Sequence, residues 1–117
     1  MWYPHDVLNP ELSVDVRVAG DRLVVTLAGE LDLTSKEQLL STVAQAIVDT
    51  IEIIEVNVSG LRFCDSTGLA TFLRLRRAAQ ADGRCLYLTE APASLLTLLE
   101  TTGLVSLLDP PPRPKPA

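Results

Sequence analysis

The side chains most capable of chemistry in this chain stand in one short polar run, Asp65-Ser66-Thr67-Gly68, between an apolar stretch and a helical pattern. Asp and Ser are favoured at the N-cap of a helix, so the run also suits a purely structural junction. The N-terminus of a helix offers unpaired N–H groups and the positive end of the helix dipole, and both favour a bound phosphate. A serine at this position could therefore accept a phosphoryl group without unfolding its helix.

Enzymatic chemistry finds little support in the sequence. A nucleophilic serine needs a base within hydrogen-bond reach, but the only histidine is His5, near the N-terminus, and no G-x-S-x-G elbow is present. Neither the P-loop pattern nor the G-x-G-x-x-G pattern of nucleotide-binding loops occurs. Two cysteines and one histidine are too few for a zinc site. We therefore expect no enzyme, no catalytic residue, no metal ion and no cofactor.

The composition is that of one globular domain with an acidic surface. The 117 residues, 47% of them hydrophobic, are enough for a single core. The formal net charge of −5 argues against binding to nucleic acid or to anionic lipid, which both attract Lys and Arg. No apolar run approaches the roughly 20 residues of a membrane span, and no signal-peptide pattern opens the chain. We expect a cytoplasmic protein that contacts neither nucleic acid nor membrane.

The two cysteines, Cys64 and Cys85, lie among apolar residues at expected strand positions. Free cysteine is among the most buried residue types and behaves as a small hydrophobic side chain. We therefore expect two reduced thiols that pack in the core, although the count also fits a redox pair.

The first half of the chain alternates strand and helix patterns. Period-2 alternation predicts strands at 12–20 and 22–29, joined into a hairpin by a tight turn at Gly20-Asp21. A helix follows, and Thr34 with Glu37 three residues later has the spacing of a capping box, with Thr34 as the N-cap.

The second half continues the alternation. The expected elements are a strand at 53–58, a helix from the Ser66 junction to about 82, a strand at 84–90, a helix at 91–103 and a last strand or extended piece at 104–108. Pro92 suits the first position of its helix, and Gly103 suits its end. Strands that alternate with helices imply an α/β fold with a mixed, mostly parallel sheet, an N-terminal hairpin and about three main helices.

A basic cluster accompanies the helix that begins at the polar run. Thr71, Arg74 and Arg77 gather opposite its apolar arc at 100° per residue, and Arg76 and Arg84 lie close by in the sequence. Such a cluster is either the solvated side of a helix or a contact patch, and the residues alone leave both readings open.

Three segments together resemble the STAS-domain anti-sigma factor antagonists of bacteria. They are "GELDLTS" at 29–35, "FCDSTGL" at 63–69 and "APASLLTLLETTGL" at 91–104, and the similarity runs over roughly residues 13–108. The Asp-Ser-Thr-Gly-Leu run after a buried strand is the most specific of the three. Ala70 departs from the pattern, because many family members have Gly there.

The resemblance implies a switch between protein partners. An antagonist of this family binds an anti-sigma factor with a GHKL-type serine kinase fold and thereby frees a sigma factor. The kinase would phosphorylate Ser66, with Thr67 as the second candidate, and a PP2C-type phosphatase would remove the phosphate. The residues that the resemblance assigns to partner binding are Asp32, Asp65, Ser66, Thr67, Gly68 and Leu69.

Proline content and lack of periodicity mark the two ends of the chain, the resemblance covers the part between them, and it also suggests one alternative function. We expect a loose N-terminal arm at 1–10, a single STAS domain at 11–109 and a disordered proline-rich tail at 110–117. Other STAS domains are non-switching scaffold subunits of transport or stress-sensing complexes, and that function is the alternative. It would show as co-purification with a permease or ATPase without phosphate on Ser66.

Overall fold

The computed structural model describes residues 11–111, so the expected arm at 1–10 and most of the expected tail lie outside the described residues. The elements in chain order are β1 (Leu12–Ala19), β2 (Arg22–Leu31), α2 (Lys36–Ala46), β3 (Ile53–Cys64), α3 (Ser66–Ala81), β4 (Cys85–Thr89), α4 (Ala93–Thr102) and the 3-10 helix η1 (Val105–Leu108). This arrangement confirms the α/β class and the three main helices.

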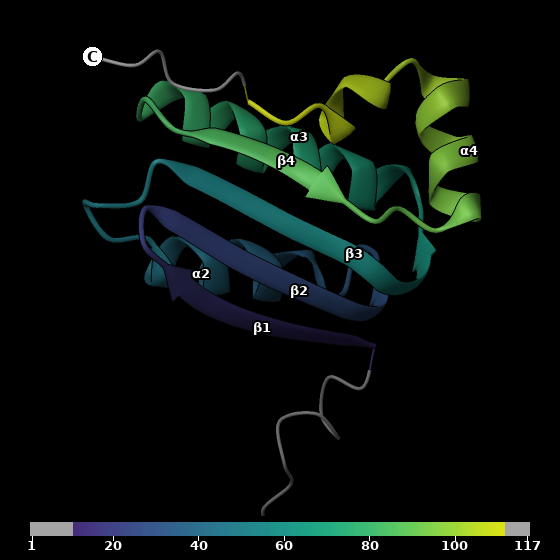
Figure 1. Cartoon of the computed structure of the whole chain (residues 1–117). Coiled ribbons are helices and arrows are strands. Elements are labelled where there is room, and N and C mark those ends of the chain that lie inside the picture. Colours follow the sequence, from purple (N-terminus) through teal and green to yellow (C-terminus); the bar gives the residue numbers. More distant parts are fainter. Residues whose placement is uncertain (1–10, 112–117) are drawn as a thin grey trace, which may run out of the picture.

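The four strands form one mixed sheet in the order β1-β2-β3-β4 (Figure 1). β1 is antiparallel to β2, whereas β2 with β3 and β3 with β4 are parallel. The hairpin closes at Ala19 opposite Arg22, and Gly20 takes a φ of 64° in the two-residue turn. Glycine adopts that left-handed conformation without steric cost, so the expected hairpin is confirmed.

The core lies between one face of the sheet and the helices α2 and α3, which Figure 1 shows together behind the strands. The inward side chains alternate along β2, as its period-2 pattern predicts, and also along β3. They are mainly Leu23, Val25, Leu27 and Leu31 from β2, Ile54, Val56 and Val58 from β3, and Leu39, Val43, Leu69, Phe72 and Leu75 from the helices. These apolar side chains pack α2 and α3 against one face of the sheet.

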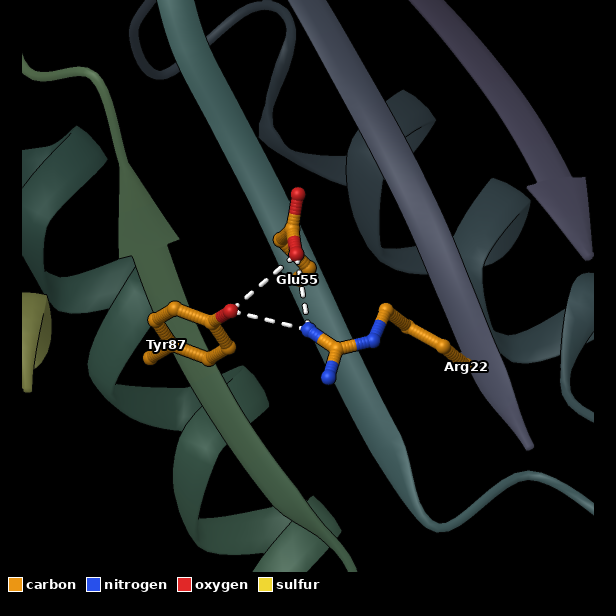
Figure 2. Close-up of polar contacts among 3 residues, drawn as sticks. All are labelled: Arg22, Glu55 and Tyr87. Carbon is orange, nitrogen blue, oxygen red and sulfur yellow. Dashed lines mark hydrogen bonds and ion pairs between the residues drawn. The ribbon is translucent and has the colours of Figure 1, made fainter. Parts of the chain in front are cut away.

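The other face of the sheet carries a polar triangle that joins β2, β3 and β4. Nη1 of Arg22 donates to Glu55 at 2.8 Å and to Tyr87 at 2.9 Å, and the Tyr87 hydroxyl donates to Glu55 at 3.0 Å. Figure 2 shows the three side chains turned toward one another. Hydrogen bonds to Glu55 and then to Tyr87 raise the pKa of Arg22. These contacts hold neighbouring strands in register at the end of the sheet remote from Ser66.

The last expected element is wrong in type. Residues 105–108 form a 3-10 helix rather than a strand, with Leu107 N–H donating to the carbonyl of Leu104 at 3.0 Å. Leu107 is fully buried, so one apolar anchor beside β4 decides the conformation of this short segment. Four residues are too few for the periodicity of apolar side chains to distinguish a strand from a 3-10 helix.

Two helix starts differ from expectation. Ser35, not Thr34, is the N-cap of α2, and no side-chain cap hydrogen bond forms there. The expected capping box is absent because the Thr34 hydroxyl bonds instead to Asp32 at 2.8 Å. Pro92 is the N-cap of α4 rather than its first helical residue, whereas Gly103 ends α4 with a φ of 75° as expected.

The expected strand at 53–58 extends to Cys64 and shifts its register against β2 on the way. A Cβ on Gly60 would stand 2.8 Å from the carbonyl oxygen of Leu27, so the backbones approach each other there more closely than any side chain allows. Beyond this irregularity β3 continues to Cys64, so its junction with α3 lies at the carboxyl end of the parallel strands.

The two cysteines differ in environment. Cys64 is partly buried, but Cys85 is exposed, so the expectation of two core residues is wrong for Cys85. Cys85 pairs with Ile53 at the start of β3, whereas Cys64 ends that strand. The two thiols are therefore separated by about 35 Å of strand, well beyond disulfide reach within one chain.

Candidate functional site

The candidate site is the junction where β3 ends and α3 begins. Asp65 is the N-cap of α3, and its Oδ1 accepts a hydrogen bond from the Gly68 N–H at 3.0 Å. This bond satisfies one of the free N–H groups of the first turn and fixes the course of the backbone. Ser66, the first helical residue, is exposed, and its hydroxyl has no hydrogen-bond partner among residues 11–111. The hydroxyl is thus exposed at the first position of α3.

Gly68 and Leu69 support the junction from inside. Leu69 is 3% exposed and lies in the core. A Cβ on Gly68 would stand 2.6 Å from the Sγ of Cys64 and 2.9 Å from the carbonyl oxygen of Leu31, so only glycine fits. Both residues pack α3 against the two strands, and their assignment to partner binding by the resemblance stays a prediction.

Asp32 closes the loop that follows β2. Its Oδ1 accepts from the Thr34 N–H at 3.0 Å and from the Thr34 hydroxyl at 2.8 Å. These bonds, with the hydroxyl contributing most, lower the pKa of Asp32, so this half-buried side chain is a carboxylate at neutral pH. A local turn thus fixes a negative charge at the end of β2.

Ser35 locks the same loop and was not singled out by the sequence analysis. This 1% exposed residue donates from its hydroxyl to the Glu30 carbonyl at 3.0 Å and accepts from the Asp32 N–H at 3.1 Å. The sequence did offer a signal for Ser35, because serine is a common N-cap and Ser35 follows Thr34 at the start of the helix. The capping-box spacing between Thr34 and Glu37 favoured Thr34 instead. The buried hydroxyl ties both sides of the loop together.

The fold brings the Asp32 loop and the Ser66 junction to one edge of the sheet. Leu31 and Cys64 pair as neighbours at the ends of β2 and β3, and Asp32 and Asp65 each follow one of them. Thr67 is partly exposed beside Ser66, and its carbonyl accepts from the buried Thr71 hydroxyl at 2.9 Å. Two carboxylates therefore share the edge with the exposed serine hydroxyl.

The thiol beside the junction is unreactive. Burial, and to a lesser degree the neighbouring Asp65 charge, raises the pKa of Cys64 to about 12. A thiol with that pKa stays protonated at neutral pH and is a poor nucleophile. The Sγ of Cys64 instead packs where the missing side chain of Gly68 would be.

Two large apolar side chains near the junction are exposed, and the sequence analysis did not identify them. Leu33 is 65% exposed and Phe63 is 49% exposed. Leu33 follows Asp32, and Phe63 lies three residues before Ser66 opposite Glu30 of β2. Apolar groups beside fixed charges are a composition typical of protein-binding surfaces.

Neither a metal nor a membrane span is indicated in the described part of the chain. Within residues 11–111, no group of three or more His, Cys, Asp or Glu side chains could hold a metal ion. None of the helices described there has both the length and the apolar character needed to cross a membrane.

The chain belongs to the STAS domain family. Residues 14–109 match the family model described as "Mlab, STAS domain", which confirms the family resemblance. The chain is 35% identical over 89 residues to the "Anti-sigma F factor antagonist" of Lysinibacillus sphaericus, covering 74% of this chain and 75% of that protein.

Solved structures share the fold. The anti-sigma factor antagonist SpoIIAA in its unphosphorylated form aligns with a TM-score of 0.71 at 24% identity, covering 83% of this chain and 86% of that chain. The Bacillus cell fate determinant SpoIIAA in the phosphorylated form aligns with a TM-score of 0.65 at 24% identity, over 83% of this chain and 89% of that chain.

Proposed function

We propose that this protein is an anti-sigma factor antagonist that Ser66 switches. The unphosphorylated form binds an anti-sigma factor of the GHKL kinase type and thereby frees a sigma factor. One observation carries the proposal: the Ser66 hydroxyl is exposed at the N-terminus of α3 and has no hydrogen-bond partner in the described part of the chain. The names of the curated relatives and the two phosphorylation states of the structural neighbour support it.

Phosphorylation at this hydroxyl is a complete group transfer. The Ser66 oxygen forms a bond to the γ-phosphorus of ATP as the bond to ADP breaks, and the hydroxyl proton passes to a base of the kinase. The phosphate then sits at the N-terminal end of the α3 dipole, where negative charge is favoured. Hydrolysis by a PP2C-type phosphatase restores the hydroxyl. Thr67 is the second candidate acceptor.

The switch is electrostatic. Phosphorylation adds roughly −1.5 to −2 charges at neutral pH. Asp32 and Asp65 already make the edge acidic, and the kinase brings a nucleotide with its own phosphates. Two like charges about 4 Å apart repel by about 4 kcal/mol at an effective dielectric of 20. A shift from 99% to 1% bound needs about 5.5 kcal/mol, which a doubly charged phosphate and lost packing together can supply.

The test measures binding and phosphorylation with each purified GHKL anti-sigma factor from the source genome. Ser66→Ala should bind one of them like the parent and take up no phosphate, because it lacks the acceptor. Ser66→Asp should raise the Kd about a hundredfold, since it brings charge into the contact. Isothermal titration gives the Kd, and mass spectrometry after incubation with ATP locates the phosphate.

Thr67→Ala is the matched control and should still be phosphorylated. Phosphate found only on Thr67 would move the switch by one residue. Equal binding by the parent and Ser66→Asp would refute the electrostatic switch. Stable co-purification with a permease or ATPase, with no phosphate on Ser66, would favour the scaffold function instead.

A further inference from the structure

The basic cluster of the α3 region divides into two parts with different environments. Arg84 is engaged internally, since its Nε donates to the Ile51 carbonyl at 2.8 Å. Arg76 donates to the Ser106 hydroxyl at 3.2 Å, which ties α3 to the C-terminal 3-10 helix. These two arginines are therefore engaged in hydrogen bonds between segments of the domain.

Arg74 and Arg77 have no such role. Both side chains are exposed, and neither makes a hydrogen bond or ion pair within residues 11–111. Among residues 11–111 nothing occupies these two exposed side chains, so they are available to carboxylates of another molecule.

These arginines share a helix face with the candidate phosphorylation site. At 100° per residue, Arg77 lies about 20° and Arg74 about 80° around the axis from Ser66, and Ala70 lies between at about 40°. The rise of 1.5 Å per residue puts Arg74 about 12 Å and Arg77 about 16 Å along the helix from Ser66. All four residues are exposed, and we call them the α3 stripe: Ser66, Ala70, Arg74 and Arg77.

We propose that the α3 stripe docks an acidic segment of the anti-sigma factor, with Arg74 and Arg77 paired to its carboxylates. This inference rests on the proposed function. The planar guanidinium group binds carboxylates through two parallel hydrogen bonds, so a pair of free arginines selects an acidic partner surface. Ala70 presents only a methyl group between the serine and the arginines, which lets the partner backbone approach the helix. Contact along the stripe would present Ser66 at one end of the docked segment.

The experiment compares charge reversals on and off the stripe. Arg74→Glu and Arg77→Glu should each raise the Kd for the GHKL anti-sigma factor several-fold, and the double variant about tenfold or more. The loss should shrink as NaCl rises from about 50 to 500 mM, because screening removes the contribution of these charges. Arg17→Glu makes the same change of charge on exposed β1 and should leave the Kd within about twofold. Thermal melting checks that all variants fold.

The outcomes separate this inference from the proposed function. If Ser66→Asp weakens binding but the double arginine variant binds like Arg17→Glu, the stripe is only a solvated face and the inference is overturned, while the switch stands. If the arginine variants weaken binding and Ser66→Asp does not, the docking surface stands without the switch. Unchanged anti-sigma binding, with the arginine variants losing retention on phosphatidylglycerol vesicles that the parent shows, would overturn the inference in favour of a membrane.

Discussion

Gly68 shows how a single residue determines the packing of α3 against the sheet beside the candidate site. Alanine is the better helix former, so helix propensity alone favours Gly68→Ala by about 1 kcal/mol. The structure opposes that gain, because the new Cβ would stand 2.9 Å from the Leu31 carbonyl oxygen and 2.6 Å from the Cys64 Sγ. The thiol can rotate aside, but the carbonyl belongs to the backbone of β2. The close approach of α3 to the sheet therefore requires glycine.

We expect Gly68→Ala to lower the free energy of unfolding by about 1–2 kcal/mol, since overpacking costs about 1–3 kcal/mol before the propensity gain. Urea unfolding followed by circular dichroism measures the loss. Adding Cys64→Ala should recover part of it, because one of the two clashes is then removed. A Gly68→Ala protein as stable as the parent would show that α3 can shift outward without cost.

Among the elements, three strands depend on polar contacts on the face of the sheet away from α2 and α3. Arg22, Glu55 and Tyr87 each come from a different strand, and each bonds to the other two (Figure 2). Side-chain exposures of 36% for Arg22 and 24% for Glu55 limit the strength of their ion pair, because solvent screens it. The triangle therefore fixes the register of the three strands more than it adds to the free energy of unfolding.

We expect Tyr87→Phe to lower the free energy of unfolding by about 0.5–1.5 kcal/mol, because its hydroxyl bonds to both partners. Arg22→Met should cost up to about 1 kcal/mol, and a double-mutant cycle should show the two changes to be coupled. Arg17→Met on β1 is the control and should change stability by less than about 0.5 kcal/mol. Additive losses at Arg22 and Tyr87 would mean that the triangle is not formed in solution.

At the scale of the whole molecule, the site joins a rigid body to an exposed reactive group. The N-cap bond of Asp65, the glycine contact and the buried Leu69 hold the first turn of α3 without the Ser66 hydroxyl. A phosphate on that hydroxyl therefore changes the charge of the surface and leaves the core packing intact. A switch of this kind acts on partner affinity rather than on the fold.

We expect the Ser66-phosphorylated protein to unfold cooperatively with a Tm within about 5 °C of the unmodified form, because a charge at a helix N-terminus changes stability by only about 0.3–1 kcal/mol. Calorimetry of both forms tests this, with Ser66→Ala treated with the same kinase as the control. Loss of the cooperative transition on phosphorylation would mean that the switch unfolds the domain.

Features that depend on near neighbours in the chain could be predicted from the sequence alone. The period-2 runs marked the strands, the Gly20-Asp21 pair marked the hairpin, and Asp65 marked the start of α3. Periodicity, turn chemistry and caps act within a few residues, so local reading identified the order of the elements and the mixed sheet. The junction between β3 and α3 at Ser66 could be predicted from the sequence for the same reason.

Which side chains are buried could be seen only in the folded chain. Thr71 shares a polar arc with Arg74 in the sequence, yet it is 3% exposed and its hydroxyl donates to the Thr67 carbonyl. Phe63 lies in an apolar segment, yet it stays half exposed at the end of β3. Burial depends on what a distant part of the chain places against a residue, and short-range patterns do not contain that information. The same reason explains why the free arginines of the α3 stripe could be separated from Arg76 and Arg84 only after the chain was folded.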